Sequence, residues 1–181
     1  MKIRKNHVTR LERKTILVLV SFLLFALPVL SANAMPSGKK LNLSGTWILN
    51  EQKSDFGEYG RMMASDKLII VHKKKNLTFE RFATAPTGEA YNYTENYTID
   101  GKECVNPLFE ESKKTSTVSR TEDKKGLVIN STLDLFFEGQ EMKILTVENF
   151  TLEEGGKIMV IKATASTDYG DMTVKFVYDL E

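Results

Sequence analysis

Leu43-Ser44-Gly45-Thr46-Trp47-Ile48-Leu49-Asn50 contains the only tryptophan of the chain and the first of ten runs that are typical of β-strands. The runs are rich in Val, Ile, Thr, Tyr and Phe, and turn signals such as Asp100-Gly101 separate them. The predicted strands are 45–50, 67–72, 77–84, 89–99, 102–105, 113–121, 127–137, 141–152, 157–167 and 172–180. Successive hairpins form an up-and-down meander, and closure removes its exposed edges. The sequence therefore predicts an all-β fold, an antiparallel meander of eight to ten strands closed into a barrel.

The last four predicted strands agree on which side faces inward. In 127–137 the apolar side is odd-numbered, and a four-residue loop at 138–141 pairs Phe137 with Met142. The loops 153–156 and 168–171 carry the same side through the remaining strands. The inward residues of the last three strands are then Met142, Ile144, Thr146, Glu148, Phe150, Leu152, Met159, Ile161, Ala163, Ala165, Met172, Val174, Phe176, Tyr178 and Leu180.

A second inward side is predicted on strand 89–99, where Tyr91, Tyr93, Glu95, Tyr97 and Ile99 alternate with polar residues. If this side faces inward, it lies opposite the side of strand 77–84 that contains Arg81. Arg81 then stands directly or diagonally across from Tyr93 or Glu95, and long side chains reach such neighbours.

Residues 1–34 have the features of a secretory signal peptide. A basic segment precedes the apolar run Ile16–Leu30, and Ala32-Asn33-Ala34 places small residues at a cleavage site. The apolar run is shorter than the ~20 residues of a membrane-spanning helix. We expect a single barrel domain at 35–181, periplasmic or secreted, and not integral to the membrane after cleavage. Without the leader the chain has 19 basic and 23 acidic residues, and a net charge of −4 gives no electrostatic basis for nucleic-acid binding.

The sequence offers no catalytic or metal-binding constellation. His72 is the only histidine beyond the leader, and no nucleophile motif accompanies it. Cys104 is the only cysteine, so it is expected to be a small buried residue, with an intermolecular disulfide as the alternative. Too few ligands of either type exist for a histidine and cysteine metal site. We therefore predict a protein that is not an enzyme and has no cofactor or metal.

Three segments resemble secreted bacterial lipocalin-like proteins: Gly45-Thr46-Trp47-Ile48-Leu49-Asn50, Lys53-Ser54-Asp55-Phe56-Gly57 and Tyr97-Thr98-Ile99-Asp100-Gly101-Lys102-Glu103. The resemblance implies a β-barrel in which Gly45 and Trp47 are structural, with Trp47 closing the floor. It also implies a mouth at the opposite end and an interior that binds small apolar molecules. The chain departs from animal lipocalins because no arginine follows Arg120 to cover the tryptophan.

Two functions remain open after these observations. The first is a non-catalytic binding protein for a small hydrophobic or amphipathic molecule, and the second is a filled barrel that acts as an envelope-associated protein-interaction or inhibitor module. A continuous interior pocket of about 300 Å³ or more would favour the first. The predicted ligand-binding residues are Arg81, Tyr93, Glu95, Tyr97, Glu148, Phe176 and Tyr178.

Polar groups inside such a barrel also have a purely structural interpretation. Glu95, Arg81 and Glu148 are expected to satisfy one another and the tyrosine hydroxyls, because buried charges need partners. The lysine pairs and triplet at 73–75, 113–114 and 124–125 fall at turns or strand starts. We expect them to be solvated and to protect strand edges from aggregation.

Overall fold

The computed structural model describes residues 40–57, 60–137, 139–168 and 170–181, so the predicted signal peptide lies outside the described residues. Within these ranges the fold is all-β, as predicted, with no helix long and apolar enough to cross a membrane. The elements are β1 (Gly45–Leu49), η1 (Gly60–Met63), β2 (Lys67–Lys73), β3 (Asn76–Thr84), β4 (Ala90–Thr98), β5 (Glu103–Pro107), β6 (Lys113–Arg120), β7 (Gly126–Phe137), β8 (Gln140–Glu153), η2 (Glu154–Gly156), β9 (Ile158–Thr167) and β10 (Gly170–Leu180).

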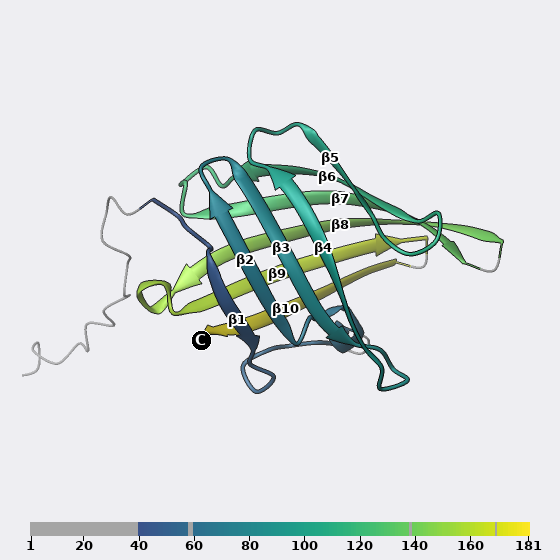
Figure 1. Cartoon of the computed structure of the whole chain (residues 1–181), viewed down its shortest axis with the longest axis horizontal. Coiled ribbons are helices and arrows are strands. Elements are labelled where there is room, and N and C mark those ends of the chain that lie inside the picture. The colour runs from purple at the N-terminus through teal and green to yellow at the C-terminus, as the bar shows by residue number, and fades with distance from the viewer. Residues whose placement is uncertain (1–39, 58–59, 138, 169) are drawn as a thin grey trace, which may run out of the picture. The chain divides into compact units, whose positions relative to one another are not determined.

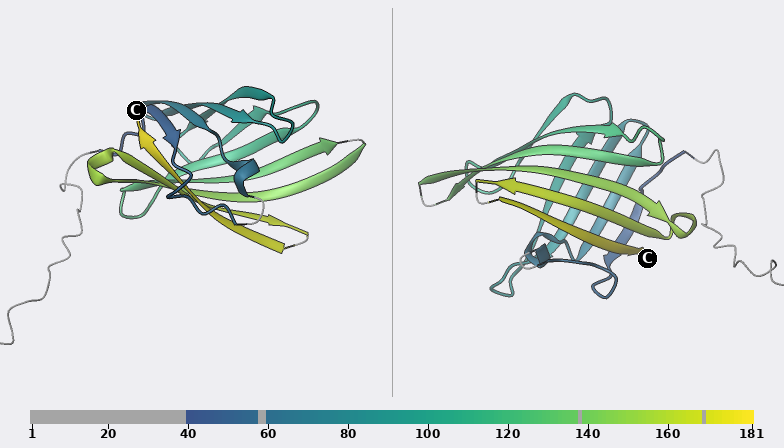
Figure 2. Two further views of the ribbon diagram at one scale, coloured as in Figure 1. Left: turned by 90° about the horizontal axis from the view of Figure 1, so that it is seen from below. Right: turned by 180° about the vertical axis from the view of Figure 1, so that it is seen from behind.

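The strands form one antiparallel sheet in the order β4-β3-β2-β1-β10-β9-β8-β7-β6-β5. Every neighbouring pair except β1 and β10 is consecutive in the chain, which is an up-and-down meander. Figures 1 and 2 show β1–β4 crossing over the long strands β7–β10, so that the sheet wraps around one core. The predicted meander and its near-closure into a barrel are confirmed.

The inward sides follow the predicted alternation, whereas three hairpin registers differ from the prediction. Phe137 pairs with Gln140 in place of Met142. The β9–β10 hairpin is displaced in the same direction, so that Ala163 lies opposite Val174 and Ala165 opposite Met172. The β8–β9 hairpin is displaced in the other direction, and Leu152 pairs with Met159 in place of Lys157. The β7–β8 and β9–β10 turns are tighter than the four-residue loops that were expected, whereas four residues, 154–157, still separate the paired ends of β8 and β9. Because the displacement is two residues, each side chain stays on its predicted side of the sheet.

Side chains from β5 join the two end strands of the sheet. Among the described residues β4 and β5 do not share a backbone ladder. The backbone N–H of Asn96 donates to Asn106 Oδ1 at 2.7 Å, and Asn106 Nδ2 donates to the Asn96 carbonyl at 3.2 Å. The Thr98 N–H donates to Cys104 Sγ at 3.2 Å. Cys104 is half-buried at this junction of β4 and β5, here called the seam, and it makes a polar contact there. It was expected to be a small buried apolar residue.

The N-terminal segment before β1 closes one end of the barrel. Leu41 and Leu43 are buried in the core beside Trp47, whose Nε1 donates to the Leu43 carbonyl at 2.9 Å. The Leu43 N–H donates to His72 Nδ1 at 3.3 Å. Trp47 thus belongs to a floor that backbone and side-chain hydrogen bonds hold in place. Gly45 has φ +152°, a backbone conformation that favours glycine.

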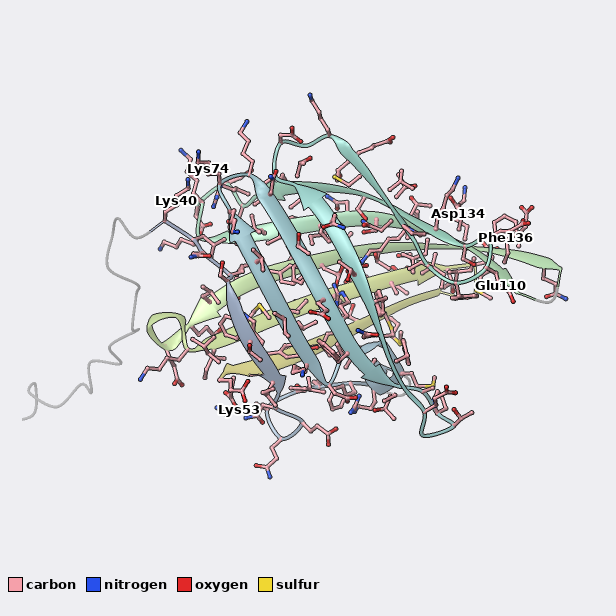
Figure 3. All side chains as sticks on the ribbon, in the orientation of Figure 1. Lys40, Lys53, Lys74, Glu110, Asp134 and Phe136 are labelled. Atoms are coloured by element: carbon pink, nitrogen blue, oxygen red, sulfur yellow. The ribbon has the colours of Figure 1, made fainter. Side chains whose placement is uncertain are left out.

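The two ends of the barrel carry different connections. The floor end holds the β2–β3, β4–β5, β6–β7 and β8–β9 connections, and the opposite end, here called the mouth, holds η1 and the remaining connections. In Figure 3 the labelled Lys40 and Lys74 lie at the floor end, whereas Glu110, Asp134 and Phe136 lie at the far end of the long strands.

Candidate functional site: a cavity at the mouth of the barrel

A cavity of about 180 Å³ lies inside the barrel at the mouth. Side chains of η1 and of both halves of the sheet line it, and they are mostly apolar with a few charged and hydroxyl groups. The lining residues are Met62, Met63, Ala64, Ser65, Arg81, Ala83, Tyr91, Tyr93, Lys114, Leu133, Thr146, Glu148, Ala163 and Phe176. Met62 and Tyr91 are 61% and 47% exposed, so the cavity opens to solvent between them.

This volume is below the ~300 Å³ that is the usual lower size of a ligand site. The floor half of the barrel is filled, because side chains such as Trp47, Phe150, Met159 and Tyr178 are fully buried there. The interior is therefore neither a wide cup nor a completely filled core. It can enclose a small molecule or one end of a longer one.

The short helix η1 is fixed at the mouth by polar contacts and a close approach. Arg61 Nη2 lies 2.6 Å from Asp66 Oδ1, and its Nε lies 2.9 Å from Glu51 Oε1. A Cβ on Gly60 would stand 2.4 Å from Val174 Cγ1, so only glycine fits this position without a shift. This seat places Met62 and Met63 over the cavity.

At the base of the cavity two cations and two carboxylates form an ionic cluster of Arg81, Glu95, Lys114 and Glu148. Arg81 Nε lies 2.5 Å from Glu95 Oε2, and Lys114 Nζ lies 2.9 Å from Glu95 Oε1. Contacts to Glu148 are longer, 3.3 Å from Lys114 and 3.5 Å from Arg81. The four side chains are between 2% and 13% exposed, so the cluster is almost entirely removed from water.

Strand register explains how these four residues meet. Arg81 on β3 lies opposite Tyr93 on β4, and Glu95 is its diagonal neighbour, as the sequence predicted. Lys114 enters from β6 and Glu148 from β8, both on inward-facing positions. Arg81 and Glu95, on β3 and β4, lie near one end of the sheet, and Lys114 and Glu148, on β6 and β8, lie in its other half. Only closure of the sheet brings the two sets of residues together.

The charges in the cluster shift one another's ionisation. Burial by itself raises the pKa of the Glu95 carboxyl, but Arg81 and Lys114 outweigh it and lower that pKa to about 2. Burial lowers the pKa of Lys114 and of Arg81, and the two carboxylates more than compensate, so both pKa values are raised. With two basic and two acidic side chains, the cluster carries no formal net charge.

An aromatic layer separates the ionic cluster from the filled core. Phe79 packs edge-on against Tyr97 with ring centroids 5.8 Å apart, and its ring lies 5.5 Å from that of Phe150. Arg81 Cζ lies 5.2 Å from the centre of the Phe79 ring, a cation–π distance. Burial raises the pKa of Tyr97, and its hydroxyl has no hydrogen-bond partner among the described residues.

The structure divides the predicted ligand-binding residues into two groups. Arg81, Tyr93, Glu148 and Phe176 line the cavity. The others lie deeper: Glu95 is held in the cluster, and Tyr97 is 3% exposed below it. Tyr178 is also buried and donates its hydroxyl to the Ser65 carbonyl at 3.0 Å. Burial likewise raises the pKa of Tyr93 and of Tyr178.

Lys114 was wrongly predicted to be solvated. It is 7% exposed, because it faces inward on β6 together with Ser116 and Val118. The interior carboxylates Glu95 and Glu148 outnumber the single predicted interior arginine. That imbalance was the signal in the sequence that a second cation had to face inward.

Thr146 is a second cavity residue that the sequence did not assign to the site. It is 9% exposed, and its hydroxyl has no hydrogen-bond partner among the described residues. Within the same residues no group of three or more His, Cys, Asp or Glu side chains is arranged to hold a metal ion. The polar chemistry of the cavity is therefore that of hydrogen bonds and fixed charges.

Comparison with known proteins identifies the fold. No family model matches the chain, and no curated protein matches it. A solved structure that is similar is the zebrafish ileal bile acid-binding protein complexed with cholic acid, with a TM-score of 0.50 and 15% sequence identity. The match covers 76% of this chain and 98% of that one. At this identity the likeness shows the fold alone, and the chain has the fold of a lipocalin-like β-barrel.

Proposed function

We propose that this protein binds a small hydrophobic or amphipathic molecule in the mouth cavity without transforming it. The carrying observation is a half-open cavity lined mainly by apolar and aromatic side chains with a small number of charged and hydroxyl groups, which is the usual composition of a small-molecule site. The similar zebrafish barrel was solved with cholic acid, an amphipathic molecule, and this supports the proposal by analogy only.

The size of the cavity limits how such a ligand sits. About 180 Å³ encloses a small molecule or one end of a larger one, with the remainder passing between Met62 and Tyr91 to solvent. Exposed thioether and aromatic side chains at this opening suit a hydrocarbon surface. Burial of apolar area against these walls supplies the main driving force for binding.

A thermal-unfolding screen tests the proposal. A ligand at a hundred times its Kd stabilises the folded state by about 2.7 kcal/mol, which is readily measured. Ala83→Leu fills space in the cavity wall and is expected to abolish this stabilisation. Ala90→Leu, at an exposed position on the next strand, is the matched control and should retain it. Absence of stabilisation across a panel of apolar and amphipathic compounds would refute the proposal.

We also propose that residues 1–34 direct export and that the mature protein is periplasmic or secreted. The supporting observation is the basic segment, apolar run and small-residue cleavage pattern of that stretch. N-terminal sequencing after expression in a bacterial host should give a chain that begins at Met35. Retention of the complete leader on a cytoplasmic product would contradict it.

A second candidate function, protein interaction through the outer surface, is favoured by one observation. Val105, Leu145 and Val147 are 62%, 52% and 38% exposed on the outer side of β5 and β8. Threonines of β6 and β7 connect Val105 and Leu145 in one row across the sheet. Pull-down with this surface changed by Leu145→Lys tests that role and leaves the mouth cavity intact.

A further inference from the structure

The ionic cluster at the base of the cavity has no net charge, and this fixes what a ligand can bring to it. We propose that the part of the ligand that enters deepest is an uncharged polar group, a carbonyl or hydroxyl at the end of an apolar chain. This inference rests on the proposed binding function and specifies its ligand class. A site of this kind differs from one that binds a carboxylate or an amine, because its deepest ligand group is uncharged.

The acidic and basic side chains of the cluster already match one another in number. Both oxygens of Glu95 and both of Glu148 are engaged by Arg81 and Lys114, so every charge already has its counter-charge. A ligand carboxylate would make three anions against two cations, and an amine would make the reverse. A buried charge without its own partner costs several kcal/mol. A charged group therefore gains little at this base.

The base of the cavity also offers hydrogen-bond donors. A guanidinium has five N–H donors and an ammonium three, and the ion pairs of the cluster use only part of them. Arg81 and Lys114 both line the cavity. Within the described residues the buried hydroxyl of Thr146, on the same wall, makes no hydrogen bond. The site thus offers hydrogen-bond donors. A carbonyl or hydroxyl oxygen of a ligand can accept hydrogen bonds from these donors without adding charge.

The lining above the cluster determines which kind of chain the ligand can carry. Apolar side chains, among them Met63, Ala83, Leu133 and Phe176, make up much of the remaining lining, together with the hydroxyl-bearing Ser65, Tyr91 and Tyr93. The four apolar side chains can pack against hydrocarbon. With the charged groups gathered at the base, this lining suits a molecule that has one polar end and an apolar chain.

A headgroup series with a constant chain tests the inference. Octanol, octanamide, octanoate and octylamine carry the same hydrocarbon, and calorimetry or thermal unfolding at pH 7 gives their relative affinities. We expect the alcohol and the amide to bind at least about tenfold more tightly than either ion, which corresponds to about 1.4 kcal/mol. Tighter binding of octanoate or octylamine would overturn the inference and leave the binding function standing. Failure of all four to bind counts against the proposed function itself.

Charge-changing variants give an independent readout. Glu148→Gln leaves the cluster with one excess positive charge, so octanoate should gain affinity relative to octanol. Lys114→Gln leaves one excess negative charge, so octylamine should gain instead. Glu89→Gln removes an exposed carboxylate outside the cavity lining and is the control, for which the ranking should not change. An unchanged ranking in a folded cluster variant would overturn the inference, and the wild-type ranking decides it if neither variant folds.

Discussion

Replacing Glu95 by glutamine removes the most deeply buried carboxylate of the ionic cluster and leaves Arg81 and Lys114 to share Glu148. The pKa of Glu95 is lowered from 4.5 to about 2 in the folded protein. A difference of this size corresponds to about 3 kcal/mol of stability at neutral pH. Loss of one partner from a buried ion pair costs a similar amount, about 3–5 kcal/mol. We therefore expect Glu95→Gln to lower the free energy of unfolding by about 3 kcal/mol at pH 7.

The pH dependence distinguishes this mechanism from a simple packing defect. Because the folded-state pKa of Glu95 is lowered, its contribution is fully present above the unfolded-state value near 4.5 and is lost as the pH falls towards 2. Urea unfolding of wild type and Glu95→Gln between pH 7 and pH 2 should show a stability difference that shrinks through this window. Exposed Glu89→Gln is the control and should follow wild type.

Two outcomes would refute the reasoning about Glu95. Equal stability of wild type and variant at pH 7 would show that the ion pairs contribute nothing, and a constant difference down to pH 2 would assign the loss to packing. The double variant Arg81→Met with Glu95→Gln restores charge balance, because Lys114 and Glu148 remain as a pair. We expect it to lose less stability than the sum of the two single changes.

Further predictions address the seam and the floor. Asn106→Ala removes both hydrogen bonds to the backbone of β4, so we expect a loss of about 1–3 kcal/mol and faster amide hydrogen exchange along β4, with exposed Asn92→Ala as control. Unchanged exchange would contradict this role. Trp47→Phe removes the hydrogen bond to the Leu43 carbonyl and should cost about 1–3 kcal/mol in urea unfolding, whereas an unchanged midpoint would count against the floor contact. Burial, together with two nearby basic side chains, lowers the pKa of His72 below 6.5, so its contribution to stability is present above pH 6.5 and is lost as the pH falls below it. Thermal unfolding between pH 8 and pH 5 should show this loss in wild type and not in His72→Gln, and identical profiles would refute it.

The number of strands and their inward sides could be predicted from the sequence, because alternation of side chains is a local property of each strand. Tyr93 and Glu95 on β4, like Glu148 and Phe176 on the C-terminal strands, share the inward side that their spacing indicates. Hairpin registers were less determined, since turns of two and four residues differ by a slip that keeps every side chain on its own side. The Phe137–Gln140 pairing is one such case.

The site itself depends on contacts between segments that are distant in the chain. The sequence contains Lys114 next to Lys113, a pattern that indicates a solvated turn, and only the closed sheet shows it facing Glu95 from the opposite wall. Closure also sets how much of the interior is filled and how large a cavity remains at the mouth. Sequence alone therefore determined the strands and the residues each could turn inward. The tertiary structure decided which of these charges meet, because their pairing depends on the spatial closure of two halves of the sheet that no local pattern records.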